Sequence, residues 1–441
     1  MSKLKELIDR LCPDGVEFKP LGELGVFFGG LTGKSKDDFK DGNAKFITYV
    51  NIYSNPALNI DVNDFVKVDE KEKQNRIQKG DILFTGSSET PNECGFTSVV
   101  TCEISEPIYL NSFCFGLRLS NPALFNLDFL KHILRSEELR KQIGKTASGV
   151  TRFNVSKARL SKVVLPIPPL EVQNEIAKIL DRFTDYAAEL QAELQARKEQ
   201  YEYYRNLLLT FNPAACGCGT DGEQEIKSTA QRAITPPRWL NNVNIIWKPM
   251  GEIGTFTRGN GLQKKDFTDS GVGCIHYGQI YTHYGTFATE TKSFVSPAFA
   301  SKLRKAKYGD LIIATTSENV EDVGKALAWL GSEEIAISGD SYIFSHNQNP
   351  KFIAYLMQTH RFLRFKRMNV SGTKVTRISG ESLEKYLIPI PPIVLQEKIV
   401  DILDRFETLV NDLTQGLPAE IAAVKERYEY YRDRLLTFQQ A

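Results

Sequence analysis

A long stretch of the chain carries apolar residues at alternating steps of three and four positions. The series begins at Ile176 and ends at Phe211, and only Arg197 breaks it. This spacing is the heptad pattern of a coiled-coil helix, sustained for about five heptads. It predicts a helix over residues 170–211 that is about 60 Å long at 1.5 Å per residue.

A second apolar series of the same kind runs from Ile399 to Phe438. It predicts a helix over residues 393–438, with two successive four-residue steps around Leu417. Gly416 and Pro418 lie at this stutter, and they predict a kink or a helix stop followed by a new start. Each long helix could pack on its own globular domain, but two matched seams favour antiparallel pairing with each other.

The two helical stretches belong to an internal repeat. Residues 166–183 match residues 389–406 at 11 of 18 positions, with an offset of 223. Residues 198–211 match residues 425–438 at 11 of 14 positions, with an offset of 227. The chain is therefore two copies of one unit, which implies internal pseudo-two-fold symmetry.

The parts that precede the helices are of mixed α and β character. Short apolar runs bounded by turn residues predict strands at 82–84, 113–119 and 311–313, and amphipathic periodicity predicts helices at 127–143 and 350–368. The predicted fold class is α+β, with two similar α+β domains and two long helices that form an antiparallel coiled coil. The small, polar and glycine-containing residues of 216–234 predict a linker between the copies, which we place at 216–242.

The first helical stretch contains a tandem tetrapeptide, Ala-Glu-Leu-Gln at residues 188–191 and again at 192–195. Four residues add about one helical turn, or about 6 Å, and leave the packed face almost unchanged. The repeat therefore suits the adjustment of helix length, although a slippage-prone stretch without consequence would look the same.

Composition excludes several classes of protein. The chain has 441 residues, 55 Lys and Arg against 54 Asp and Glu, and a formal net charge of +1, which excludes a uniformly basic DNA-coating protein. Seven sparse cysteines argue against a disulfide framework. The sequence shows no apolar run of the length that a membrane span needs and no signal-peptide pattern at its start, so we expect a cytoplasmic protein without a membrane partner.

Motifs that would carry chemistry are incomplete. The string at Gly29–Ser35 is one residue too short for a phosphate-binding loop, and the acidic residues around Asp14 and Glu17 have no counterpart in the second copy. Cys216 and Cys218 have no nearby Cys or His pair with which to hold zinc. We therefore predict a non-catalytic chain with no cofactor and no metal of its own.

Basic residues cluster at equivalent places in the two copies. Residues 131–162 hold nine Lys or Arg and two acids, and residues 351–385 hold eight and two. Each cluster contains a helix face, with Arg135 and Arg140 in the first copy, and a Ser-Gly loop that ends in Thr-Arg. Cations beside hydroxyl and backbone donors suit phosphate contacts, so we predict nucleic-acid binding, with a solvated charged face as the alternative.

Base reading requires Arg, Lys, Asn, Gln, Ser, Thr or Tyr side chains on loops that can enter a groove. The base-reading candidates of the first copy are Lys34, Ser35, Lys36, Asn51, Tyr53, Ser87, Ser88 and Asn111, and those of the second copy are Arg258, Asn260, Gln263, Lys264, Gln279, Tyr281, Thr316, Ser317 and Asn319. The DNA-binding candidates of the basic clusters, expected to contact phosphates, are Lys145, Ser148, Thr151 and Arg152 in the first copy and Lys374, Thr376 and Arg377 in the second. Because we take the base-reading positions to differ between the copies, we expect the two halves to read different sequences; turn chemistry or strand-edge packing is the alternative for each residue.

These features together resemble a known family. Each copy closes with Ser-Gly and Thr-Arg, a Pro-Ile-Pro-Pro stretch, a glutamine (Gln173, Gln396) and a long helix that contains Tyr-Glu-Tyr-Tyr-Arg. This pattern is similar to that of the specificity subunits of type I restriction-modification systems, over essentially the whole chain. The resemblance implies target recognition domains at 1–165 and 243–388, a central conserved coiled-coil helix at 166–215, a linker at 216–242 and a C-terminal conserved helix at 389–441.

The resemblance also implies a function in host defence and DNA methylation. Each recognition domain would read one half of an asymmetric, bipartite target in double-stranded DNA, and the coiled coil would set the spacer. The implied partners are two methyltransferase subunits that bind S-adenosylmethionine and two motor-nuclease subunits that need ATP and Mg²⁺. Exposed Tyr203 and Tyr430 would contact the methyltransferase subunits, or simply pack. The competing hypothesis is a coiled-coil adaptor whose domains bind protein rather than DNA.

Overall fold

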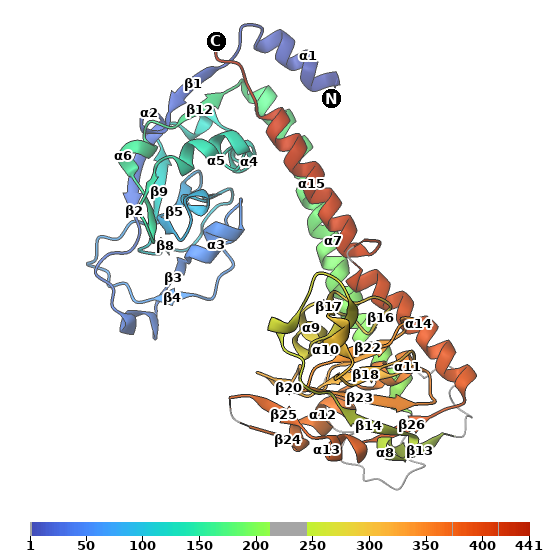
Figure 1. The fold of residues 1–441 in the computed structure, drawn as a ribbon. Coiled ribbons are helices and arrows are strands. Elements are labelled where there is room, and N and C mark those ends of the chain that lie inside the picture. The colour runs from blue at the N-terminus through green and yellow to red at the C-terminus, as the bar shows by residue number, and fades with distance from the viewer. Residues whose placement is uncertain (1, 212–244, 373, 413) are drawn as a thin grey trace. The chain divides into compact units, whose positions relative to one another are not determined.

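The computed structural model describes residues 2–211, 245–372, 374–412 and 414–441. Contacts divide the chain into two compact units, unit 1 (Met1–Ala192 with Ala419–Ala441) and unit 2 (Glu193–Pro418). Each unit contains one α+β domain and parts of the long helices (Figure 1). This confirms the predicted fold class. The predicted linker at 216–242 lies outside the described residues, and the predicted domain limits stay predictions.

The domain of unit 1 is built on a four-stranded antiparallel sheet in the order β2-β9-β5-β7. Its strands are β2 (Gly25–Gly29), β9 (Cys114–Leu119), β5 (Ile82–Thr85) and β7 (Thr97–Val99). Three smaller sheets complete the domain: β4 (Phe65–Val66), β3 (Ala44–Ile47) and β8 (Ile108–Leu110); β10 (Ala147–Ser148), β11 (Phe153–Val155) and β6 (Ser87–Ser88); and β1 (Glu17–Pro20) with β12 (Val164–Ile167). Its short helices include α1 (Ser2–Leu11), α2 (Leu21–Leu24), α3 (Tyr49–Ser54) and α6 (Lys157–Leu160).

The domain of unit 2 repeats this plan. Its main sheet has the order β14-β23-β19-β21-β16, and the counterparts of the three smaller sheets are β17-β15-β22-β18, β20-β25-β24 and β13-β26. The strands are β13 (Ile246–Pro249), β14 (Gly254–Arg258), β15 (Val272–Ile275), β16 (Phe287–Ala288), β17 (Ser293–Val295), β18 (Lys305–Ala306), β19 (Leu311–Ala314), β20 (Thr316–Ser317), β21 (Ala326–Trp329), β22 (Ile335–Ile337), β23 (Ser341–His346), β24 (Val370–Ser371), β25 (Thr376–Ile378) and β26 (Leu387–Ile390). Its short helices include α8 (Met250–Ile253), α9 (Tyr277–Thr282), α10 (Pro297–Ala300) and α13 (Gly380–Glu384).

Each amphipathic segment predicted as one helix is in fact two helices. The segments divide into α4 (Leu127–Ile133) and α5 (Glu137–Gly144) in unit 1, and into α11 (Pro350–Leu356) and α12 (His360–Asn369) in unit 2. The hydroxyl of Ser136 accepts a hydrogen bond from the Leu139 amide, and that of Thr359 accepts one from the Phe362 amide. Both residues are therefore N-caps that start a new helix, which the apolar period alone does not reveal.

The long helices match the prediction in the first copy and differ from it in the second. Helix α7 is continuous from Leu170 to Thr210, whereas the second stretch is broken into α14 (Ile393–Asn411) and α15 (Leu417–Leu435). The expected break at Gly416 and Pro418 is confirmed. A Cβ atom on Gly416 would lie 2.4 Å from the Thr408 carbonyl oxygen, so this turn needs glycine. Within the part of the chain that the structure describes, no helix is long and apolar enough to cross a membrane.

Within each unit, α7 packs against one of these two helices. In unit 1, Phe183 stacks on Tyr431 with ring centroids 5.4 Å apart, and Tyr186 donates a hydrogen bond to Glu420. Since the residue numbers run in opposite directions, α7 and α15 are antiparallel. In unit 2, Phe406 of α14 stacks against two tyrosines of α7, at positions 201 and 204. The heptad seam therefore pairs helices, as its period predicts.

A buried glutamine joins each domain to the start of its long helix. Gln173 accepts a hydrogen bond from the Asn126 amide at 2.8 Å and donates to the carbonyl oxygens of Leu124 and Pro168. Gln396 makes the equivalent contacts, since it accepts from the Asn349 amide at 3.0 Å and donates to the Pro391 carbonyl. Both side chains are 0% exposed. The glutamine of the repeat is therefore a structural residue that fixes the angle between domain and helix.

A second junction between domain and helix lies eight residues further along each long helix. In unit 1, the buried His132 ring lies 2.8 Å from Asp181 through Nε2 and 2.9 Å from the Tyr428 hydroxyl through Nδ1, and Lys131 also pairs with Asp181. In unit 2, Tyr355 takes the place of the histidine, and its hydroxyl donates to Asp404. The two copies thus use different residues for the same contact between domain and helix.

The His132 junction makes unit 1 sensitive to acid. Burial lowers the pKa of His132, and Asp181 offsets only part of this effect. Below about pH 6.5 the unfolded chain therefore binds a proton that the folded unit resists, so unit 1 loses stability as pH falls, by at most about 1.4 kcal/mol per pH unit. Unit 1 contains no other histidine. Hydrogen exchange of α4 between pH 8 and 5 will show this loss in the wild type. The His132→Gln variant will be less stable at pH 8, and its stability will lack the part of the pH dependence that comes from the histidine. Equal slopes would contradict the assignment.

Candidate nucleic-acid interface

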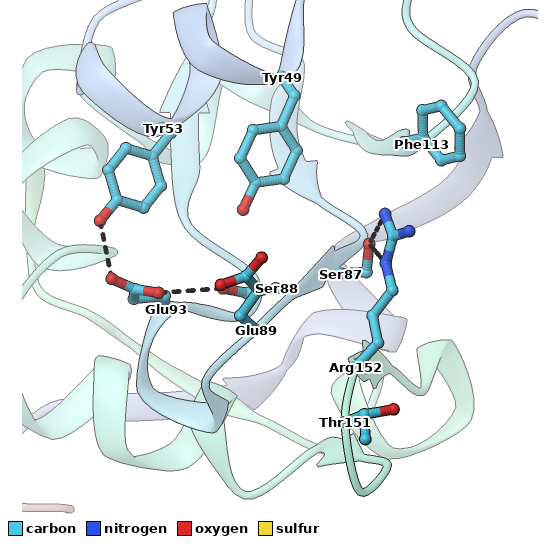
Figure 2. Close-up of a pocket in the computed structure, with 9 residues that line it drawn as sticks. All are labelled: Tyr49, Tyr53, Ser87, Ser88, Glu89, Glu93, Phe113, Thr151 and Arg152. Atoms are coloured by element: carbon cyan, nitrogen blue, oxygen red, sulfur yellow. Dashed lines mark hydrogen bonds between the residues drawn. The ribbon is translucent and has the colours of Figure 1, made fainter. Parts of the chain in front are cut away.

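The structure forms a pocket of about 630 Å³ in unit 1 at the meeting point of several loops. It is lined by Tyr49, Tyr53, Ser87, Ser88, Glu89, Glu93, Phe113, Thr151 and Arg152. Figure 2 shows the two tyrosines of α3 side by side at one end, and Arg152 with Phe113 at the other. Five of the predicted DNA-binding candidates therefore come together here: Tyr53, Ser87, Ser88, Thr151 and Arg152.

Hydrogen bonds hold the aromatic end and the acidic wall of the pocket in place. Glu93 accepts from the hydroxyls of Tyr53 at 3.3 Å, Ser88 at 3.1 Å and Thr90 at 3.0 Å. The rings of Tyr49 and Tyr53 are nearly parallel, with centroids 6.2 Å apart. Burial raises the pKa of Tyr49, so its hydroxyl stays protonated at neutral pH and can donate to a ligand. Glu89 is exposed.

The guanidinium of Arg152 is fixed at the opposite end. Its Nε and Nη2 atoms donate to the Ser87 hydroxyl at 3.1 and 3.0 Å, and its Cζ atom lies 5.6 Å from the Phe113 ring centroid. Asn111 accepts a hydrogen bond from the Phe113 amide, which shapes the turn that presents this ring. Gly149 has φ +151°, and a Cβ atom there would lie 2.0 Å from the Arg152 carbonyl oxygen. The Ser-Gly loop therefore needs its glycine to place Arg152.

The arginines of the predicted basic helix face do not line the pocket but bond the backbone of segments next to it. Arg140 donates to the carbonyl oxygens of Asn92, Cys94 and Gly95, and Arg135 donates to those of Ile52 and Thr97. Burial lowers the pKa of both arginines to about 10. The expectation that these two arginines form a phosphate-binding face is therefore wrong, because their donors hold the protein's own backbone. Lys145, at the end of α5, is exposed.

The equivalent region of unit 2 has the same frame and different side chains. The Tyr281 hydroxyl donates to the Thr316 carbonyl, and strand pairing sets Thr316 opposite Arg377 and Ser317 opposite Thr376. Thr316 also bonds Asp340, which precedes β23 as Phe113 precedes β9. Unit 2 therefore has an acidic side chain, Asp340, at the place where unit 1 has the Phe113 ring.

Strand register corrects the pairing of the two Thr-Arg sequences. Ser148 pairs with Asn154, and Ser371 pairs with Arg377, so Arg377 is the counterpart of Asn154. The counterpart of Arg152 is Val375, whose carbonyl faces Gly372 just as that of Arg152 faces Gly149. The Thr-Arg sequences therefore look alike but occupy different places, one in a loop and one in a strand.

Comparisons with known proteins identify the family of this chain. The family model described as the type I restriction modification DNA specificity domain matches residues 13–199 and 247–423. The chain belongs to this family. It is 29% identical over 304 residues to a putative type I restriction enzyme specificity subunit of Haemophilus influenzae, an alignment that covers 66% of this chain and 68% of the relative. It is also 29% identical over 296 residues to the EcoR124I/EcoR124II specificity subunit of Escherichia coli, covering 64% of this chain and 65% of that subunit.

A solved structure from work on the assembly and conformational transition of the type I restriction-modification system shares the fold of this chain. It aligns with a TM-score of 0.57 at 18% identity and covers 96% of this chain and 98% of its own. The specificity-subunit resemblance seen in the sequence is thus confirmed, and the repeated domains are specificity domains.

The remaining candidates of the first specificity domain lie outside the pocket or behind it. Lys34 pairs with Glu72 at 2.6 Å, and the amide and hydroxyl of Ser35 both donate to Asp38. Asn51 is buried, and its amide donates to the Asn59 carbonyl. Ser35, Lys36 and Ser148 are exposed, and Asn111 is half-buried. DNA contact by any of these residues stays a prediction.

In the second specificity domain most candidates also make internal contacts. Arg258 donates to the Gly339 carbonyl, Asn260 to that of Lys302, Gln279 to Ser293 and Asn319 to Asp322, and the Gln263 amide donates to Asp266. Lys264, Lys374 and Arg377 are exposed, whereas Thr376 is buried. Their roles in DNA binding likewise stay predictions.

Sequence reasoning missed Tyr49, Glu89, Glu93 and Phe113. A signal for the first two existed, because Tyr49 has a counterpart in Tyr277 and Glu89 in Glu318 within the internal repeat. The expectation that all candidates differ between copies is wrong, since Tyr53 and Tyr281 occupy the same place in α3 and α9. The differences concentrate at the Phe113 and Arg152 end of the pocket.

Proposed function

We propose that this chain is the non-catalytic DNA-recognition subunit of a type I restriction-modification enzyme. Each specificity domain reads one half of an asymmetric, bipartite target in double-stranded DNA. The observation that carries this proposal is the pocket of unit 1 and its equivalent region in unit 2, which share one frame and differ in side chains at the Phe113 and Arg152 end. Such a pair suits a target with two unlike halves.

The chemistry of the pocket supports base reading. The major groove presents donors, acceptors and the thymine methyl group in a pattern that differs for each base pair. The pocket offers guanidinium and hydroxyl donors, carboxylate acceptors and aromatic faces on loops, which are the groups that can distinguish these patterns. Exposed Lys145 and Lys36 suit contacts to the flanking phosphates.

The helices carry the second half of the proposal. We infer that the coiled coil sets the spacer between the two half-targets, which the uninterrupted 41 residues of α7 support. Two methyltransferase subunits dock on the conserved helices, where Tyr203 is 38% and Tyr430 57% exposed. Two motor-nuclease subunits complete the enzyme. S-adenosylmethionine, ATP and Mg²⁺ bind these partner subunits in the proposed complex.

The test is the methylation pattern of DNA from cells that express this chain with its cognate methyltransferase subunit. Single-molecule sequencing will show a split, asymmetric motif with a fixed spacer, and cells that lack only this chain will not show it. If no chain-dependent motif appears although the complex forms and the methyltransferase is active, the chain does not read DNA. The adaptor hypothesis, in which the domains bind protein, would then replace this proposal.

A further inference from the structure

We propose that Arg152 determines specificity by reading one guanine in the half-target of unit 1. This inference rests on the proposed function, because it names what one of the two specificity domains recognises. It assigns to Arg152 a role that differs from the phosphate contact expected from its place in a basic cluster.

The geometry of the guanidinium suits a guanine edge. Ser87 engages the Nε and Nη2 atoms along one side of the group, and Phe113 lies beside it. One hydrogen of Nη1 and the second hydrogen of Nη2 point the same way and form a two-pronged donor, which makes no hydrogen bond within the part of the chain that the structure describes. Guanine presents O6 and N7 as paired acceptors in the major groove, and arginine binds them in this bidentate way. Because the side chain is already fixed, little rotamer entropy is lost on binding.

The charges around Arg152 argue against a phosphate at this place. Glu89 and Glu93 line the same pocket, so the pocket holds two carboxylates and one guanidinium. Glu93 is fixed there by three hydroxyl donors. A phosphate would be repelled by both carboxylates, whereas a base edge carries no net charge and also presents amino groups that carboxylates accept from.

The described residues of unit 2 do not repeat this arrangement. Val375 occupies the loop position of Arg152, and Asp340 occupies that of Phe113. The arginine of the second Thr-Arg sequence, Arg377, lies instead in β25, opposite Thr316. Guanine reading from this loop position is therefore confined to the half of the target that unit 1 recognises.

The first experiment changes the DNA and leaves the protein intact. The complex of the full chain with its methyltransferase subunits is bound to duplexes of its own target, in which each guanine in turn is replaced by 7-deazaguanine, which lacks the N7 acceptor. We expect one guanine, in one half-target, at which the replacement weakens binding by about tenfold. A loss of this size is near the low end of the binding discrimination that a bidentate arginine–guanine pair provides. With Arg152→Gln the same replacement will have no further effect, since the two changes remove one contact. If no guanine is sensitive, or if Arg152→Gln keeps the sensitivity, the proposal is wrong.

The second experiment compares methylation motifs. Arg152→Gln should relax one guanine position of one half-target and leave the other half and the spacer unchanged. Arg159→Gln removes the same charge from an exposed position on α6 and should leave the motif intact. A uniform loss of binding to all sequences, with a smaller salt dependence, would show a phosphate contact and overturn the proposal. Failure of the proposed function would look different, because the wild-type chain itself would then give no motif.

Discussion

Replacement of Gln173 by leucine will lower the free energy of unfolding of unit 1 by about 2–4 kcal/mol, because it leaves buried backbone groups without partners. Gln173 bonds the Asn126 amide and the carbonyl oxygens of Leu124 and Pro168, and leucine of similar volume can bond none of them. Hydrogen exchange of α4 and of the first turns of α7 measures this loss within unit 1. The domain should then lose its fixed angle on the helix, and methylation of the bipartite motif should fall with it.

The chain provides its own controls for this prediction. Gln396→Leu removes the equivalent contacts in unit 2 and should destabilise that unit by a similar amount while unit 1 is unchanged. Gln195→Leu changes an exposed glutamine of α7 whose side chain bonds Glu199 within the helix, and its effect should stay within about 0.5 kcal/mol. If Gln173→Leu and Gln195→Leu are equally mild, the buried glutamine does not hold the junction.

The main features of the fold could be predicted from sequence because they depend on periodicity and repetition. The heptad seam predicted α7 within one residue of its end at Thr210, and the stutter with Gly416 and Pro418 predicted the break before α15. Apolar period could not reveal the division of α4 from α5, because a capping hydroxyl at Ser136 interrupts the helix without interrupting the apolar face. Local hydrogen bonds decided these details.

The candidate site was less accessible to sequence reasoning because its residues are distant in the chain. Charge clustering pointed to Arg135 and Arg140, yet both are used to hold backbone carbonyls, and the repeat motif suggested that Arg152 and Arg377 are equivalent. Strand register shows that they are not. Which arginine faces a ligand depends on burial and on a two-residue difference in strand register, and neither property can be read from composition.

Insertion of one further Ala-Glu-Leu-Gln unit after residue 195 will change the spacer of the target and leave both half-targets unchanged. The existing units lie within α7, and their leucines, Leu190 and Leu194, are buried at 4% and 6% exposure. A four-residue insertion adds about one turn, or about 6 Å, and keeps an apolar residue on the packed face. Against about 3.4 Å per base pair along each strand of DNA, the preferred spacer should lengthen by one or two base pairs.

Methylation motifs of the wild-type chain and the insertion variant measure this effect directly. The matched control is an insertion of the same four residues after residue 120, in the exposed turn that follows β9 in unit 1, which lengthens the chain without lengthening a helix. It should leave the spacer as it was. A longer spacer only for the insertion in α7 would establish the helix as the ruler, since neither specificity domain is altered. An unchanged spacer with full methylation would mean that the distance between the half-targets is set elsewhere, and the coiled-coil part of the proposed function would then be wrong.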